Sequence, residues 1–137
     1  MKNNLVGGLE DRQVKYLGAV HEGKKHDKKI CDEEGTRLPD GAELYRDSAF
    51  QGHELAGVTV HQPKKKPCGG QLSEEDKEAN RLISSIRVVV EHIISGVKRC
   101  RVVKEVFRNT KQGFDDVAME LACGLHNYRS QWRPQSY

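Results

Sequence analysis

The stretch "SEEDKEANRLISSIRVVVEHIISGVKRC", residues 73–100, decides the fold class of this 137-residue chain. Its apolar side chains follow the spacing of one face of an α-helix, at positions 82, 83, 86, 89, 90, 93, 94 and 97. Ser73 is a suitable N-cap, and the three acidic residues after it suit the positive end of a helix. The sequence therefore predicts one long helix whose buried stripe centres on Ile86, Ile93 and Val97.

Shorter patterns on either side of this helix predict a small sheet. Runs rich in β-branched and aromatic residues indicate three strands, at residues 14–21, 41–47 and 57–63. Residues 22–35 contain a short segment compatible with a helix, and Gly35 is a plausible stop. This order of strands and helices indicates a mixed α/β fold.

A final helix is predicted to start near Gly113 and to run to about residue 129. Its apolar residues are less regularly spaced than those of the long helix. We expect its core face to consist of Phe114, Val117, Met119, Leu121, Ala122 and Leu125.

The composition is mildly basic, with a net charge of +3 and a hydrophobic content of 36%. Basic residues gather in three clusters, formed by Lys24, Lys25, Lys28 and Lys29, by Lys64, Lys65 and Lys66, and by Arg99, Arg101 and Lys104. A run of charges is usually a solvated surface. Three such clusters in one small chain nevertheless make nucleic acid a candidate partner.

The cysteines and the hydropathy pattern indicate a soluble protein of the cytoplasm. Cys31, Cys68, Cys100 and Cys123 are widely separated, so we expect reduced thiols and no structural zinc. No apolar stretch approaches the ~18 residues of a membrane helix. The first residues lack the pattern of a signal peptide, and no membrane partner is expected.

Two carboxylates allow two interpretations. Asp47, in "RDSAFQG" (46–52), ends a predicted strand, where Asp is also an ordinary turn residue. Glu91 follows Arg87 by four residues beside the apolar stripe, and the two could form only an exposed pair worth a few tenths of a kcal/mol. Alternatively, the helix packs across the sheet and brings Glu91 near Asp47. Two converging carboxylates would suit a hard cation such as Mg²⁺.

Several segments resemble the C-terminal part of bacterial insertion-sequence DDE transposases, whose catalytic domain is RNase H-like. They are "GKKHDKKI" (23–30), "DSAFQG" (47–52), "HQPKKKP" (61–67), the block at 80–109 and "ACGLHNYR" (122–129). The resemblance implies a partial catalytic domain at residues 14–130, an N-terminal extension at 1–13 and a tail at 131–137. It also implies an incomplete RNase H-like α/β fold with three short strands, its first strands missing.

The resemblance further implies roles for individual residues. Asp47 matches the second Asp and Glu91 the Glu of a catalytic triad that binds Mg²⁺ or Mn²⁺ for phosphodiester cleavage and strand transfer at transposon ends. The implied phosphate- and DNA-binding residues are Arg87, Lys98, Arg99, Lys64, Lys65 and Lys66. His26 and Asp27 match an "HD" pair to which the resemblance gives no defined role; Asp27 as a further metal ligand is an open alternative.

The chain departs from the family pattern at the first catalytic Asp, for which it has no counterpart. Asp11 lies where the family has no catalytic carboxylate, and Ser48-Ala49 replaces a usual Thr-Gly. Three interpretations follow. The chain is a truncated or degenerate transposase, the downstream half of a transposase split over two reading frames and made as a frameshift fusion or complemented by a partner, or a non-enzymatic DNA- or protein-binding module. The expected partners are DNA at transposon ends and either the upstream half of a split transposase or further copies of the chain. In each case we expect a bacterial cytoplasmic protein, associated with the nucleoid when bound to DNA.

Overall fold

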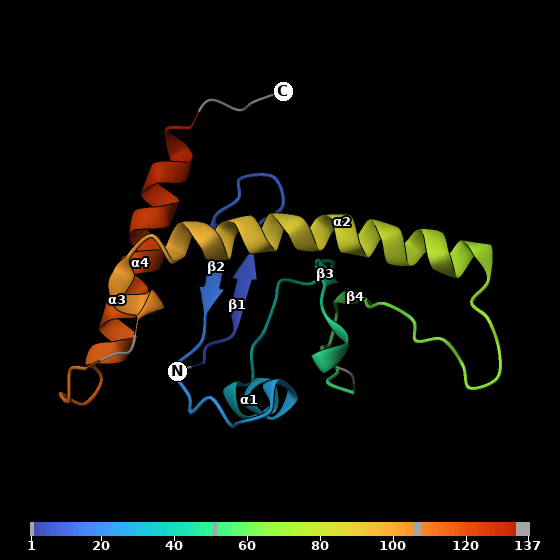
Figure 1. Cartoon of the computed structure of the whole chain (residues 1–137), viewed down its shortest axis with the longest axis horizontal. Helices are drawn as coiled ribbons and strands as arrows, with labels where there is room; N and C mark the ends of the chain where they lie inside the picture. The colour runs from blue at the N-terminus through green and yellow to red at the C-terminus, as the bar shows by residue number, and fades with distance from the viewer. Residues whose placement is uncertain (1, 51, 106–107, 134–137) are drawn as a thin grey trace. The chain divides into compact units, whose positions relative to one another are not determined.

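A computed structural model describes residues 2–50, 52–105 and 108–133 as a mixed α/β structure of short strands and helices (Figure 1). Its elements are β1 (Leu5–Gly7), β2 (Val14–Leu17), α1 (Asp27–Glu34), β3 (Glu43–Tyr45), the 3₁₀ helix η1 (Ser48–Phe50), β4 (Thr59–His61), α2 (Glu74–Val97), α3 (Arg101–Lys104) and α4 (Phe114–Gln131). They divide into two compact units. The first unit comprises residues 1–23 and 89–137, and the second comprises residues 24–88.

The predicted long helix is α2, and its predicted start is confirmed. The Oγ of Ser73 accepts a hydrogen bond from the backbone N–H of Asp76 at 3.2 Å, as an N-cap does. Ile93 and Val97 are each 1% exposed, so the apolar stripe is deepest at the C-terminal end of the helix. Leu82, at the edge of the predicted stripe, is instead exposed.

A hairpin in the first unit adds a strand that the sequence patterns do not predict. β1 pairs antiparallel with β2, with Leu5 opposite Leu17 and Val6 opposite Tyr16. The three predicted strands are confirmed as β2, β3 and β4, but the count of three is wrong because the described part of the chain holds four short strands. Around β1 only Leu5 and Val6 favour a strand, between two asparagines and two glycines, so no run of strand-forming residues marks it.

α4 confirms the predicted final helix but buries a different face. Its buried residues are Ala118, Ala122, Cys123 and His126. Ala122 and the half-buried Met119, which packs against the core cluster, agree with the predicted core face. Phe114, Val117, Leu121 and Leu125 are exposed, which contradicts it. Small side chains on the inner face allow α4 to approach the rest of the unit closely, and the large side chains turn outward.

Gly96 on α2 makes one such close approach possible. A Cβ at this position would overlap the imidazole ring of His126 on α4. The Nη2 of Arg129 donates to the carbonyl of Gly96 at 2.7 Å, and the Nε2 of His126 lies 2.9 Å from the carbonyl of Arg12. The absence of a side chain at Gly96 therefore lets one turn of α4 contact both α2 and the hairpin.

Side chains of α4 also satisfy the backbone of β2. The N–H of Val14 donates to the Oδ1 of Asn127 at 2.7 Å, and the Nδ2 of Asn127 donates to the carbonyl of Val14 at 3.0 Å. Three residues after β2, the N–H of Val20 donates to the Oδ1 of Asp116 at 2.7 Å. α4 thus supplies hydrogen bonds that a neighbouring strand would otherwise provide.

The second unit is built around a parallel pair of strands. β3 and β4 align with Glu43 opposite Thr59 and Tyr45 opposite His61, and the Tyr45 and His61 rings stack with centroids 4.5 Å apart. α1 is shorter than the segment from which it is predicted. It ends at Gly35, whose φ of 57° is left-handed and is readily adopted by glycine. The predicted stop is therefore confirmed.

All four cysteines are free thiols, as expected. Burial raises the pKa of Cys31 and of Cys123. Within the residues that the structure describes, no helix combines the length and apolar character needed to cross a membrane.

We predict that Gly96→Ala destabilises the first unit by about 1–3 kcal/mol, because the new methyl group forces the His126 ring away from α2. Ser95→Ala, at the exposed neighbouring position, is the matched control and should leave the free energy of unfolding nearly unchanged. Urea unfolding followed by circular dichroism measures both. Equal stability of the two variants would contradict the close packing at Gly96.

Candidate functional site

Asp47 lies two residues after β3, where the chain turns into η1. Arg46, just before it, donates its backbone N–H to the carbonyl of His61 on β4 at 3.1 Å. The carbonyl of Asp47 accepts a hydrogen bond from the N–H of Phe50 at 3.2 Å. The backbone of Asp47 is therefore fixed between a strand contact and a helical turn.

Arg46 and His53 hold the loop that follows Asp47. The Nη2 of Arg46 donates to the carbonyl of His53 at 2.6 Å, and burial lowers the pKa of Arg46. The Nδ1 of His53 lies 2.6 Å from the Oδ1 of Asp32 on α1, and Lys28 donates to Asp32 at 3.1 Å. No motif spacing relates Asp32 to His53, so the sequence does not predict this arrangement. Its effect is to tie the Asp47 loop to α1.

The side chain of Asp47 forms an ion pair with Arg87 of α2. The Oδ2 of Asp47 lies 3.3 Å from the Nη2 of Arg87, and the two side chains are 41% and 60% exposed, respectively. The resemblance implies that Arg87 contacts phosphate, but here it contacts the predicted metal ligand itself. An exposed pair of this kind stabilises a fold by at most about 1 kcal/mol. Arg87 therefore partly neutralises the Asp47 carboxylate, while the ion pair adds little to the stability of the fold.

Glu91 lies one helical turn beyond Arg87 on α2, and it is exposed. It belongs to the first unit, whereas Asp47 and Arg87 belong to the second. The convergence of the two carboxylates stays a prediction.

The described residues do not form a complete metal site. Within residues 2–50, 52–105 and 108–133, no three His, Cys, Asp or Glu side chains gather in an arrangement that could hold an ion. Carboxylates are the donors that Mg²⁺ prefers, so Asp47 and Glu91 are suitable in kind. They are two of the three carboxylates that the resemblance implies.

Lys64, one of the predicted DNA-binding lysines, interacts with α2. Its Nζ lies 2.7 Å from the Oδ1 of Asp76, and this hydrogen bond raises the pKa of Lys64 and lowers that of Asp76. The side chain of Asn80 makes two hydrogen bonds to the backbone of Lys64. Its Oδ1 accepts from the N–H at 3.0 Å, and its Nδ2 donates to the carbonyl at 3.1 Å. Lys65 and Lys66 are exposed on the anchored loop that follows.

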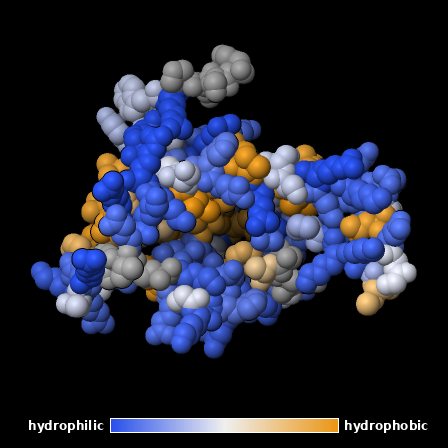
Figure 2. Space-filling model, in the orientation of Figure 1, coloured by the Kyte–Doolittle hydropathy of each residue, from blue (hydrophilic) through white to orange (hydrophobic). Residues whose placement is uncertain are grey.

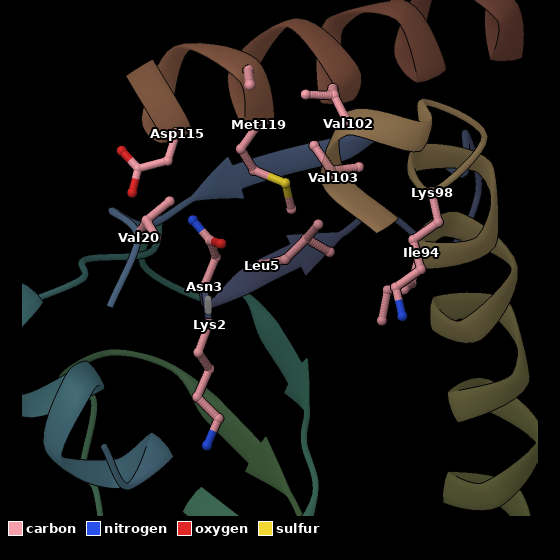
Figure 3. Close-up of a pocket in the computed structure, with 11 residues that line it drawn as sticks. Lys2, Asn3, Leu5, Val20, Ile94, Lys98, Val102, Val103, Asp115 and Met119 are labelled. Carbon is pink, nitrogen blue, oxygen red and sulfur yellow. The ribbon is translucent and has the colours of Figure 1, made fainter. Parts of the chain in front are cut away.

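Lys98 and Arg99 are exposed just past the C-terminal end of α2. Lys98 lines a cavity of about 270 Å³ in the first unit, together with Lys2, Asp115 and mainly apolar side chains (Figure 3). The lining combines the ammonium groups of Lys2 and Lys98 with the carboxylate of Asp115, which would repel a phosphate. A role of these two residues in DNA binding stays a prediction.

His26 and Asp27 both lie at the start of α1, where each has a structural role. His26 is the N-cap of α1, and its Nδ1 accepts a hydrogen bond from the N–H of Lys28 at 3.3 Å. Asp27 is the first residue of that helix, where a negative charge is favourable. The "HD" pair thus starts the helix to which the Asp47 loop is tied.

Comparisons with known proteins bear on this arrangement. The profile of the family described as "DDE superfamily endonuclease" matches residues 3–127, a range that includes Asp47, Arg87 and Glu91. The chain is 29% identical over 128 residues to the "Probable transposase for insertion sequence element IS702" of Microchaete diplosiphon. That match covers 93% of this chain and 46% of the relative, so the chain spans about half the length of the curated relative it matches. No solved structure matches the chain significantly.

The Asp32 arrangement predicts a pH dependence of stability. Hydrogen bonds from His53 and then from Lys28 lower the pKa of Asp32 below its ordinary value of 3.8. The ionised carboxylate therefore stabilises the folded state above that value, and the contribution is lost as the pH falls through the lowered pKa. Asp32→Asn should unfold more easily than the wild type at neutral pH, and the difference should shrink in acid.

Thermal unfolding between neutral pH and about pH 3 measures this difference. Glu54→Gln, which likewise replaces a carboxylate by an amide at an exposed position of the second unit, is the control. It should unfold as the wild type does at both neutral and acidic pH. A difference between Asp32→Asn and the wild type that did not depend on pH would show that the carboxylate charge is not what stabilises the loop.

The Asp47–Arg87 pair predicts a measurable but small coupling. A double-mutant cycle with Asp47→Ala and Arg87→Ala should give a coupling energy of about 0.2–1 kcal/mol. Because both side chains are exposed, the coupling should decrease as the salt concentration rises. A coupling that is absent at low salt would show that the two side chains do not pair in solution.

Proposed function

This chain belongs to the family of DDE superfamily endonucleases, and on that premise we propose that it acts in DNA transposition by providing two carboxylates of a catalytic site. Asp47 is the proposed second Asp and Glu91 the proposed Glu of an RNase H-like catalytic domain. The reaction class is divalent-metal-dependent phosphodiester cleavage and strand transfer at transposon ends. Asp47 and Glu91 are the proposed ligands of Mg²⁺ or Mn²⁺ in the complete site.

One observation carries the proposal. Asp47 follows a strand of a parallel pair and contacts Arg87, which lies one turn before Glu91 on α2. A strand end and a long helix are rigid elements, so each can hold its own functional carboxylate in place. Both residues lie inside the range that the family profile matches.

The proposed site needs a third carboxylate from outside these 137 residues. The described residues hold no three-ligand group, and the chain corresponds to less than half of the relative. We propose that the upstream half of a split transposase, or another polypeptide of the same kind, supplies the first Asp. Catalysis would then require assembly, because members of a catalytic triad act as a unit and removing one costs orders of magnitude in rate.

A second candidate function is binding without chemistry, to DNA or to protein. Lys65 and Lys66 are exposed, while Arg87 neutralises the nearby Asp47 and so reduces its repulsion of phosphate. A degenerate copy that binds through this basic surface would need neither Asp47 nor Glu91. The two functions therefore differ in their response to the same substitutions.

We predict that, once an upstream half that supplies the first Asp has been added, Asp47→Ala and Glu91→Ala each reduce Mn²⁺-dependent nicking of supercoiled DNA by at least ~10²-fold. Glu78→Ala, at an exposed acidic position of α2, is the matched control and should retain the activity. Nicking that survives in both carboxylate variants would refute the site. A wild-type chain that binds DNA but does not nick it even when the upstream half is present would support the binding function.

For DNA binding, we predict that Lys65→Ala combined with Lys66→Ala lowers the affinity uniformly across sequences. The slope of log K against log salt should fall by up to ~0.9 for each phosphate contact that is lost. Asp47→Ala should not weaken binding, because it removes a negative charge. Fluorescence anisotropy at several salt concentrations measures this, and an affinity that does not respond to salt would exclude a phosphate contact by these lysines.

A further inference from the structure

A chain of hydrogen bonds links α1 to the residue that precedes Asp47. Lys28 and Asp32 lie one turn apart on α1, and the Nζ of Lys28 donates to the Oδ2 of Asp32 at 3.1 Å. The Oδ1 of Asp32 lies 2.6 Å from the Nδ1 of His53. The carbonyl of His53 accepts a hydrogen bond from the Nη2 of Arg46 at 2.6 Å. The chain therefore ends one residue from the proposed metal ligand.

We propose that three residues position Asp47 and fix the direction in which its carboxylate points. They are Asp32, His53 and Arg46, to none of which the resemblance gives a role. Asp32 orients the ring of His53, and His53 in turn holds the side chain of Arg46. Arg46 then fixes the backbone that leads into Asp47. The proposal rests on the function proposed above, because it requires Asp47 to act in catalysis, and it assigns the three residues no contact with DNA or with metal.

Arg46 is held at both ends. Its backbone N–H donates to the carbonyl of His61 on β4 at 3.1 Å, which continues the pairing of β3 with β4. At the other end, its guanidinium donates to the carbonyl of His53. Because Arg46 and Asp47 share a planar peptide unit, the orientation that these bonds impose on Arg46 also restricts the backbone of Asp47. In this orientation the carboxylate of Asp47 lies 3.3 Å from the guanidinium of Arg87.

The loop after Asp47 is folded by two successive turns. The N–H of Phe50 donates to the carbonyl of Asp47, and the N–H of His53 donates to the carbonyl of Phe50, each at 3.2 Å. A Cβ at Gly52, whose φ of 87° is left-handed, would lie 3.3 Å from the Cε of Lys28, so α1 lies against this loop. His53 thus closes the loop that begins at Asp47. A displaced His53 would therefore also displace the carbonyl that anchors the guanidinium.

Polar contacts fix the position of α1 against this loop, because the apolar face of the helix is narrow. Its one buried residue is Ile30, which is 0% exposed. Figure 2 shows a mainly hydrophilic surface over α1, in the lower part of the view. The His53 side chain is only 11% exposed, so its hydrogen bond to Asp32 is shielded from competing water. This bond is therefore well placed to hold the helix and the loop together.

The effect of breaking the chain should fall on the metal. Groups that orient metal ligands typically contribute about 10- to 100-fold to metal affinity or activity. Loss of the bond between Asp32 and His53 should therefore raise the Mn²⁺ concentration for half-maximal nicking by about 10-fold or more, and lower the rate at saturating Mn²⁺. The KM for DNA should not change. A general loss of folded protein would instead lower the rate and leave the Mn²⁺ dependence unchanged.

Nicking of supercoiled DNA by the full chain, with an upstream half that supplies the first Asp, tests the proposal as a function of Mn²⁺ concentration. His53→Phe keeps a planar ring but removes the Nδ1 donor, so it should show the shift in Mn²⁺ dependence. His53→Asn should behave as the wild type, since its amide nitrogen can take the place of Nδ1 and donate to Asp32. Glu54→Gln, at the exposed position next to His53, is the control and should also behave as the wild type. Asp32→Ala removes the acceptor on a side chain that is 46% exposed, and it should repeat the shift whether or not His53→Phe folds.

A second measurement needs no metal, DNA or upstream half. The coupling energy between Asp47 and Arg87, from a double-mutant cycle at low salt, should vanish in the His53→Phe background. It should persist in the His53→Asn background, where the loop stays closed. A coupling that His53→Phe leaves unchanged would overturn the proposal, because the carboxylate would then keep its direction without the chain of hydrogen bonds.

The kinetic outcomes separate this proposal from the proposed function. Wild-type Mn²⁺ dependence in Asp32→Ala, together with loss of nicking in Asp47→Ala, would overturn the positioning role alone. A His53→Asn variant as impaired as His53→Phe would also overturn it, because the imidazole itself would then be required. Nicking that survives Asp47→Ala would overturn both proposals, as would a wild type that does not nick even with the upstream half.

Discussion

The contact between α2 and α4 at Gly96 is the constraint on which the first unit depends. The missing side chain admits the His126 ring, the carbonyl of Gly96 accepts a hydrogen bond from Arg129, and His126 in turn contacts the carbonyl of Arg12. These groups come from three separate parts of the chain. With α4 in this position, Asn127 reaches the backbone of β2 and Val97 packs against the small residues of α4. One small residue thus positions α4 against both the β1–β2 hairpin and α2.

Much of this architecture follows from local patterns in the sequence. The α2 helix was predictable because its apolar spacing, its N-cap at Ser73 and its acidic first turn all indicate the same structure. The stop of α1 at Gly35 was predictable for a similar local reason. β1 was not, because only Leu5 and Val6 favour a strand between asparagines and glycines, and its stability comes from pairing with β2. The inner face of α4 was not either, since hydrophobicity favours the large side chains whereas close packing favours the small ones.

The candidate site, too, was predictable only in part from the sequence. Asp47 and Glu91 were identified from a resemblance to a family, and Asp47 lies near a strand end, as its position in the sequence predicts. The partner of Asp47 was not predictable, because an arginine four residues before a glutamate looks like an ordinary helical pair. The hydrogen bonds from Arg46 to His53 and between His53 and Asp32 were not predictable either. They join residues through a loop carbonyl and across separate elements, and no sequence pattern encodes such contacts.

The Asp47–Arg87 ion pair has a consequence for how ligands would bind to the second unit. A cation that takes the Asp47 carboxylate must first compete with the guanidinium, and a phosphate that takes Arg87 must compete with the carboxylate. Each ligand therefore releases the side chain that the other one needs, so the two binding equilibria are linked. Thermodynamic reciprocity requires that whatever affinity the cation gains from the phosphate, the phosphate gains from the cation. An exposed pair that contributes little to stability can in this way make the two occupancies cooperative.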